Sequence, residues 1–341
     1  YHLHSGPLKA NLKTPVNNNT MQIEKIQALY SSSPLMTGET LYRVQVSGLR
    51  VYRRENGNTY KSLTTFLDGV MPSNRFLQTW REQMAADLGS AKAATDYVAA
   101  TADYGTILHT LIAEFVRNGG VNWAELPLYI AELLAQSGTL SADAIRSATD
   151  EMQRDFASLI QFFFDYEVEV LAVELPVWID EGVATLIDLI VTMNAKAYTE
   201  KTEPSKRQRI NSIINLKSGK KGFFDTHVYQ LEGERRMYNQ RFGDVNGKIE
   251  AVYNLAPNDW RTSPTYKLKD QSEAANAISD TFGIYLQLAK NTGLLSFEDR
   301  KITVFEGETK YGESPAQSIK QISLGDLFTA KMTENDGQNQ N

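Results

Sequence analysis

Cysteine is absent from this chain of 341 residues. Without thiols the protein forms no disulfide bonds, thiolate zinc sites or iron–sulfur clusters, and it has no cysteine nucleophile. Long apolar runs are also missing, since no stretch approaches the roughly 20 apolar residues that span a bilayer, and no apolar signal-peptide core opens the chain. These absences are compatible with an intracellular protein that has no membrane partner.

The composition that remains is that of a globular protein, with 42% hydrophobic residues and ten prolines. A chain of this length buries a full core as one large domain with an appendage, or as two modest domains. We expect a single domain over residues 41–330. Residues 1–40 are polar and irregular and are expected to form an N-terminal arm, and the almost wholly polar residues 331–341 a disordered tail.

Positive charge is scarce overall but concentrated in one segment. The net charge of −6 disfavours a nucleic-acid partner. From Lys196 to Arg241, however, eleven Lys and Arg residues face five Asp and Glu residues, a local excess of six positive charges that leaves −12 for the rest. A basic segment on an acidic body is suited to binding phosphates. The alternative interpretation is a solvated charged loop.

Helical periodicity dominates residues 41–166. Two short strands are predicted at residues 41–46 and 49–53, and Asn56-Gly57 is a turn signal. The helices that follow are predicted at residues 62–70, 74–88, 91–117, 123–136 and 142–166.

Residues 167–330 are predicted to form the sheet core and a C-terminal helix. Residues 168–179 and 183–193 read as an antiparallel strand pair, 212–217 as a third strand and 249–255 as a fourth, with a possible edge strand at 301–305. Helices are expected at 226–242 and 273–290, and a basic loop at 196–209. The predicted fold class is α/β, with a small central mixed sheet flanked by helices.

Polar residues interrupt two of these apolar strands. Asp188 lies inside one, and Asn215-Leu216-Lys217 ends another. Hydrolysis of a phosphodiester without a covalent nucleophile calls for divalent cations, which prefer oxygen ligands. Because side chains alternate along a strand, Lys217 shares a face with Asn215 and is suited to orient a water or stabilise developing charge. The alternatives are a salt-bridged Asp188 and a strand-end lysine.

His109 is one of four histidines and lies in a predicted helix, in the run Gly105-Thr106-Ile107-Leu108-His109. A lone helical histidine is more often structural than a metal ligand, so both interpretations stay open. Glu114, five residues further on, is expected to be a surface residue.

In the order and spacing of its motifs the chain resembles the RecB-like branch of the PD-(D/E)xK nucleases, and most nearly the phage-type exonucleases. The motifs are Gly105-x-x-x-His109, Glu174, Gly182-Val183-Ala184-Thr185-Leu186-Ile187-Asp188, Asn215-x-Lys217-Ser218-Gly219 and Gln230. The resemblance covers about residues 41–268. It implies a restriction-endonuclease-like core and a Mg²⁺- or Mn²⁺-dependent exonuclease that acts on DNA in recombination or repair, in the cytoplasm of a bacterium or phage-infected cell.

The resemblance also implies roles for single residues. Those implied as metal ligands are His109, Asp188, Asn215 and the backbone carbonyl of Leu216. Lys217 is implied as the catalytic lysine, with Gln230 placing the lysine or the DNA backbone and Glu174 as an auxiliary acid. The candidate phosphate-binding residues are Lys206, Arg207, Arg209, Lys220, Lys221, Arg235 and Arg236.

Three positions depart from the family pattern. Thr185 stands where the family often has a small glycine before the core of the strand that carries Asp188. Asn215 stands where the family has a second acid, which keeps an oxygen but loses a negative charge, and Glu234 stands where the family has tyrosine after Gln230. Asn215 is either an engineered change from Asp or a natural residue of a protein that binds without cutting. The sequence favours the first, because the other site positions are intact.

The competing function is a non-catalytic nucleic-acid-binding or assembly protein on the same fold, and a third interpretation is an acidic helical scaffold. If the chain is a nuclease, and only in that case, Asn215→Asp is expected to produce metal-dependent degradation of DNA. Degradation of linear but not circular DNA would indicate an exonuclease. The sequence leaves strand polarity, the choice of single or double strands, and a homo-oligomer open.

Overall fold

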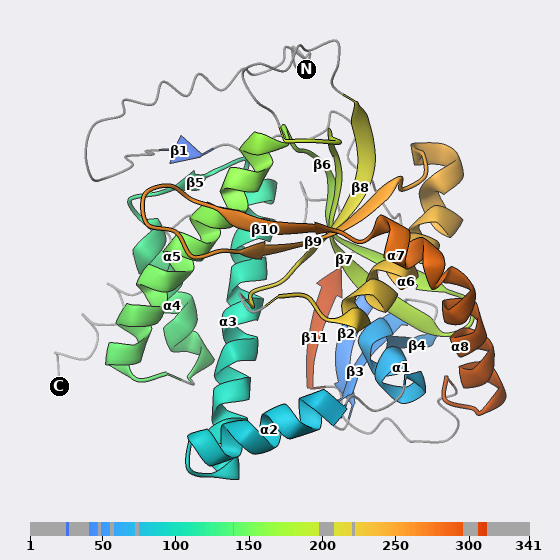
Figure 1. Cartoon of the computed structure of the whole chain (residues 1–341), viewed down its shortest axis with the longest axis horizontal. Coiled ribbons are helices and arrows are strands. Elements are labelled where there is room, and N and C mark those ends of the chain that lie inside the picture. The colour runs from blue at the N-terminus through green and yellow to red at the C-terminus, as the bar shows by residue number, and fades with distance from the viewer. Residues whose placement is uncertain are drawn as a thin grey trace, which may run out of the picture.

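The computed structural model describes residues 25–26, 41–46, 49–54, 58–71, 75–138, 140–197, 208–219, 222–295 and 306–311. In this part of the chain a central mixed sheet carries helices on both faces (Figure 1). The predicted α/β fold class is confirmed. None of the helices described is long and apolar enough to cross a membrane.

The centre of the sheet is the long hairpin predicted at residues 168–179 and 183–193. Strand β6 (Glu169–Ile179) pairs antiparallel with β7 (Val183–Asn194), with a bulge between Val170 and Ala172. Gly182 takes a φ of 103° in the connecting turn, a conformation that glycine adopts without strain.

Strand β7 also connects the two wings of the sheet. On one side it pairs antiparallel with β8 (Arg209–Leu216), which pairs parallel with β9 (Ala251–Pro257), and β9 pairs antiparallel with β10 (Tyr266–Asp270). On this same edge, which is the one away from β6, the start of β7 pairs parallel with β4 (Thr59–Ser62).

The β4 wing continues through three antiparallel strands, which are β3 (Leu49–Arg54), β2 (Leu41–Val46) and β11 (Glu306–Tyr311). The sheet has nine strands in the described part of the chain. It is larger than the small sheet expected, because the two early strands and β11 extend it. Strand β10 was not predicted, and its polar sequence Tyr-Lys-Leu-Lys-Asp explains why.

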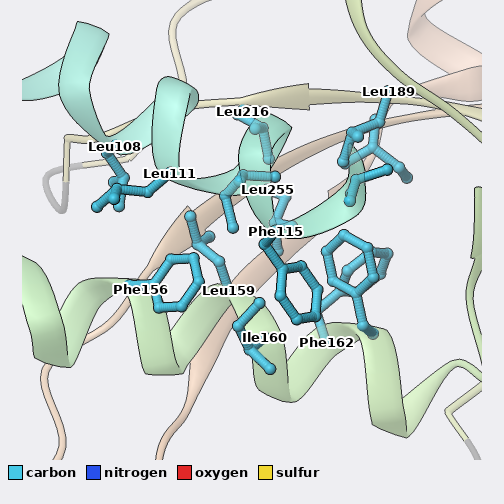
Figure 2. Packing of buried hydrophobic residues seen from close by; sticks show 14 of the residues in the cluster. Leu108, Leu111, Phe115, Phe156, Leu159, Ile160, Phe162, Leu189, Leu216 and Leu255 are labelled. Carbon is cyan, nitrogen blue, oxygen red and sulfur yellow. The ribbon is translucent and has the colours of Figure 1, made fainter. Parts of the chain in front are cut away.

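One face of the sheet is covered by α3 (Ala91–Asn118), α4 (Leu126–Ser137) and α5 (Ala142–Asp165), with α2 (Arg75–Asp87) before them (Figure 1). Figure 2 shows Phe115 of α3 above Phe156 and Phe162 of α5, with Leu216 and Leu255 from the strands nearby. The Phe115 and Phe156 rings meet edge to face at 5.9 Å. This packing fixes α3 over the strand ends.

The other face is covered by α1 (Leu63–Val70), α6 (Asp225–Asn246), α7 (Ser272–Ala277) and α8 (Ser279–Asn291) (Figure 1). The single helix predicted at 273–290 is therefore divided at Ile278. At this division the Arg236 guanidinium of α6 donates to the carbonyl and the hydroxyl of Ser279 at 2.8 and 3.2 Å.

A separate two-stranded sheet joins β1 (Lys25–Ile26) to β5 (Val121–Asn122). The other predicted helix and strand boundaries agree with the structure to within a few residues. The predicted turn at Asn56-Gly57, the edge strand at 301–305, the tail, and most of the predicted arm and basic loop lie outside the described residues.

Candidate metal centre

Asp188 lies where strand β7 changes partners. The antiparallel pairing of β7 with β8 ends at Leu189 opposite Ile214, so Asp188 and Asn215 are the next residues on the two strands. Beyond this point β7 continues to its pairing with β4. At this fork, where two strands separate, some backbone N–H and C=O groups have no partner on a neighbouring strand, and Asp188 binds one such N–H group. Its Oδ2 accepts a 2.7 Å hydrogen bond from the backbone N–H of Leu216.

His109 reaches the same carboxylate from helix α3. Its Nδ1 lies 3.4 Å from Asp188 Oδ1, and the two side chains are 33% and 19% exposed. The structure thus joins a helix and a strand end that are distant in sequence. Both groups are open enough on one side to contact a small ligand.

The pKa values of this pair move apart. Burial lowers the pKa of His109. The charge of Asp188 and its hydrogen bond to the imidazole raise the pKa, and the net shift is upward. Burial raises the pKa of Asp188, and His109, Lys217 and the Leu216 amide together bring it below its usual value. The pair is therefore favoured as an imidazolium beside a carboxylate.

Asn215 faces helix α6 and is buried, with 1% of its surface exposed. Its amide nitrogen donates to Glu234, at 3.2 Å to Oε1 and 3.4 Å to Oε2. Its carbonyl oxygen has no hydrogen-bond partner in the structure. On the neighbouring strand, the fully buried Asn254 pairs in register with Asn215, and neither of its amide atoms has a partner either.

Lys217 begins a chain of hydrogen bonds along α6. Its Nζ donates to Gln230 Oε1 at 3.1 Å, and Gln230 Nε2 donates to Glu234 Oε1 at 2.8 Å. Burial lowers the pKa of Lys217, although Asp188 and Glu234 oppose the shift. Burial and the charge of Asp188 raise the pKa of Glu234 to about 8.

Glu234 is the residue of this site that sequence reasoning did not assign a role. It appeared only as a departure from the family pattern after Gln230. The available signal was its spacing, because residues four apart on a helix share a face. With Gln230 implied to place Lys217, position 234 was bound to face the same strand ends.

Glu174 lies on β6 between Val173 and Leu175, which pair with Leu189 and Ile187, so its position in the register faces Asp188. Its φ of 50° is in the left-handed region, a strained conformation for a residue with a side chain. Its carboxylate forms an ion pair with Arg117 of α3. Glu174 is thus near the pair of His109 and Asp188, held by a cation of its own.

Glu114 corrects one expectation. It is half-buried rather than a surface residue, and both carboxylate oxygens lie 2.6 Å from the hydroxyl of Tyr129. Burial raises its pKa, and the Tyr129 hydrogen bond opposes this. It belongs to the contact between α3 and α4.

Gly105 packs against the loop that follows Lys217. A Cβ atom at this position would lie 2.9 Å from Ser218 Oγ and 3.6 Å from Ser218 Cβ. The glycine therefore allows the Lys217-Ser218-Gly219 segment to lie close to α3, one helical turn before His109. The motif Gly105-x-x-x-His109 has a packing reason as well as a chemical one.

Three of the seven predicted phosphate-binding residues, Arg209, Arg235 and Arg236, lie in the described part of the chain, and their contacts are with groups away from this site. Lys206, Arg207, Lys220 and Lys221 lie outside the described residues. Arg209 donates to the carbonyls of Glu167 and Thr192 at 2.7 and 2.8 Å.

Arg235 and Arg236 extend from α6 toward α7 and α8. Arg235 forms an ion pair with Glu232, and Arg236 lies 3.9 Å from the same carboxylate. Helical spacing puts this cluster on the opposite face of α6 from Gln230 and Glu234. DNA binding by these arginines remains a prediction.

The donor set fits a divalent cation in part. Asp188 and the orphaned Asn215 carbonyl are oxygen ligands of the kind that Mg²⁺ and Mn²⁺ prefer. His109 suits Mn²⁺ once the imidazolium has released its proton. In the described part of the chain, no group of three His, Cys, Asp or Glu residues is arranged to hold a metal ion by itself. A cation here would depend on Asn215 and on backbone or water oxygens.

Comparisons with known proteins identify no family. No protein-family model matches the chain, and no curated protein matches it. One solved structure with a similar arrangement is a "putative exonuclease" from Eubacterium rectale, with 9% sequence identity and a TM-score of 0.31 over 79% of this chain and 92% of that chain. A similarity this loose establishes neither a family nor a function.

Proposed function

We propose that this protein is a divalent-metal-dependent DNA nuclease, and more specifically an exonuclease. The observation that carries the proposal is the convergence of His109, Asp188 and Lys217 at one fork of the sheet. Three polar residues from a helix and two strands meet there, and each has a hydrogen-bonded or charged partner that fixes its position.

His109, Asp188, the carbonyl of Asn215 and the backbone carbonyl of Leu216 would hold Mg²⁺ or Mn²⁺. When bound, the cation would activate water and stabilise the charge that develops on phosphate. The chain's own groups have separate tasks. Asp188 is kept ionised by His109 and Lys217, and Gln230 accepts from Lys217 and so directs the ammonium group.

Lys217 is suited to stabilise negative charge on the phosphate or to orient the attacking water. Its burial lowers its pKa, which makes the loss of a proton easier than for a surface lysine. DNA as the substrate rests on the basic excess between Lys196 and Arg241. The exonuclease assignment rests on the resemblance of the motifs.

The test is degradation of linear and closed circular duplex DNA by the unchanged chain, with Asn215, in Mn²⁺ and Mg²⁺. We expect loss of the linear DNA only, no reaction with EDTA, and a fall of about 10²- to 10³-fold for Lys217→Ala, the effect of removing one charge-stabilising donor. A matched control is Lys267→Ala on β10, a lysine at a distance from the fork. Equal degradation by Lys217→Ala and the unchanged chain would exclude the proposed centre.

A second candidate is a nucleic-acid-binding protein that does not cut. It is favoured by the amide at position 215 and by the absence, in the described residues, of three acidic or imidazole groups placed for a metal. This candidate predicts DNA binding that weakens with salt and no degradation in either metal. Lys217→Ala should then bind DNA as well as the unchanged chain does.

A further inference from the structure

We propose that Asn215 and Glu234 form a matched pair that together replaces one acidic metal ligand, with Asn215 supplying the ligand oxygen and Glu234 positioning it and supplying the carboxyl group. The inference rests on the proposed function and deepens it. It also favours a natural Asn215 over an engineered one, contrary to what the sequence alone suggests.

The first step is the orientation of the Asn215 amide. Glu234 Oε1 accepts from Gln230 Nε2 and is therefore an acceptor, so the Asn215 amide turns its nitrogen toward it. The nitrogen of Asn215 is 3.2 Å from Glu234 Oε1, and the carbonyl oxygen is directed elsewhere. Glu234 itself is held by Gln230 Nε2 at 2.8 Å.

The second step is the orphaned oxygen. Asn215 is 1% exposed, and its Oδ1 has no partner. A buried acceptor left without a hydrogen bond destabilises the fold, and such groups in a folded protein call for an explanation by a bound water or ion. The oxygen belongs to the residue next to the Asp188 fork, where a cation is proposed.

The third step is the count of carboxyl groups. A site with Asp188 and an acid at position 215 would contain two, and the present site also contains two, in Asp188 and Glu234. An Asp at position 215 would lose the hydrogen bond that the amide nitrogen now donates to Glu234. It would also set two carboxyl groups against each other in a buried place, with like-charge repulsion wherever both are ionised. The two residues are therefore expected to depend on each other.

The experiment compares the unchanged chain with Asn215→Asp, Glu234→Gln and the double variant. The midpoint temperature of thermal unfolding, measured without metal, reports the interaction between residues 215 and 234. Asn215→Asp is expected to lower the midpoint temperature, and adding Glu234→Gln to recover most of that loss, because an amide at 234 can donate to a carboxylate at 215. Additive losses in the double variant would overturn the inference.

Mn²⁺ affinity, measured from the electron paramagnetic resonance signal of the free ion, tests the role at the metal. Glu234→Gln is expected to weaken Mn²⁺ binding by about tenfold or more, the usual effect of removing a group that orients a ligand. The double variant should return toward the natural affinity. The matched control is Glu232→Gln, since Glu232 is a buried carboxylate on the opposite face of α6 and its loss should leave Mn²⁺ binding unchanged.

The outcomes separate the two proposals. If the unchanged chain binds Mn²⁺ and Glu234→Gln binds it equally well, the matched pair is wrong and the nuclease proposal stands. If Mn²⁺ binding depends on Glu234 but no DNA is degraded, the pair is supported and the nuclease proposal is wrong. If the unchanged chain binds no Mn²⁺, both are wrong.

Discussion

The Asp188 carboxylate joins the sheet to helix α3 through His109, with Nδ1 and Oδ1 3.4 Å apart. Asp188 also accepts from the Leu216 amide on the neighbouring strand. One side chain thus ties together a helix and two strands at the place where the sheet divides. Its loss should affect both the stability of the fold and the chemistry of the site.

Asp188→Asn is expected to lower the free energy of unfolding by about 1 to 3 kcal/mol, the cost of leaving buried polar groups without their charged partner. The pKa of His109 is raised, so the attraction is present at low pH and is lost as the pH rises through that pKa. The effect of the substitution should therefore be larger at pH 6 than at pH 9 in urea unfolding. A double-mutant cycle with His109→Gln gives the coupling, and a coupling of zero would contradict the ion pair.

Gly105→Ala separates site geometry from stability. Alanine favours a helix interior over glycine by about 0.5 to 1 kcal/mol, so unfolding should not become easier. The new Cβ would lie 2.9 Å from Ser218 Oγ, which displaces the segment after Lys217. We expect nuclease activity to fall by about tenfold or more, because small displacements of a positioned group are costly. Ser218→Ala in the same chain removes the close atom and should restore activity.

Gly233→Ala tests the packing of α6 against α1 and α8. A Cβ there would meet Leu63 at 2.8 Å and Phe282 at 2.9 Å, and both side chains are fully buried. Overpacking of this kind costs about 1 to 3 kcal/mol. Chemical denaturation should show this loss. Gly283→Ala on α8 is the control, since its nearest neighbour would be Arg236 at 3.7 Å, and it should stabilise or have no effect.

His227 predicts a loss of stability in acid. Its Nδ1 accepts from the Phe224 N–H at 3.2 Å, which requires an unprotonated nitrogen. Burial, and then the charge of Lys217, lower its pKa to about 3. The unfolded chain binds this proton below about pH 6.5, so stability should fall as the pH drops from there toward 3. The free energy of unfolding should differ less between pH 7 and pH 5 in His227→Gln than in the unchanged chain.

The elements of the fold were largely predictable from the sequence because they depend on local patterns. The apolar segments 168–179 and 183–193 predicted the hairpin of β6 and β7, and helical periodicity predicted α3, α5 and α6. Strand β10 escaped because its residues are polar, and its pairing with β9 is what makes it a strand. The division between α7 and α8 also depends on contacts, since Arg236 of α6 binds Ser279 there.

The residues of the candidate site also fall into two groups, those that the sequence pointed to and those that only the structure placed. Polar residues at the ends of apolar strands pointed to Asp188, Asn215 and Lys217. The resemblance of the motifs then implied the roles of His109 and Gln230. Only the tertiary structure decided that Glu234 meets Asn215 and that Arg235 and Arg236 turn to Glu232. Hydrogen bonds between distant segments depend on how a helix is rotated against a sheet. The packing of the whole core sets that rotation, and no local pattern of residues specifies it.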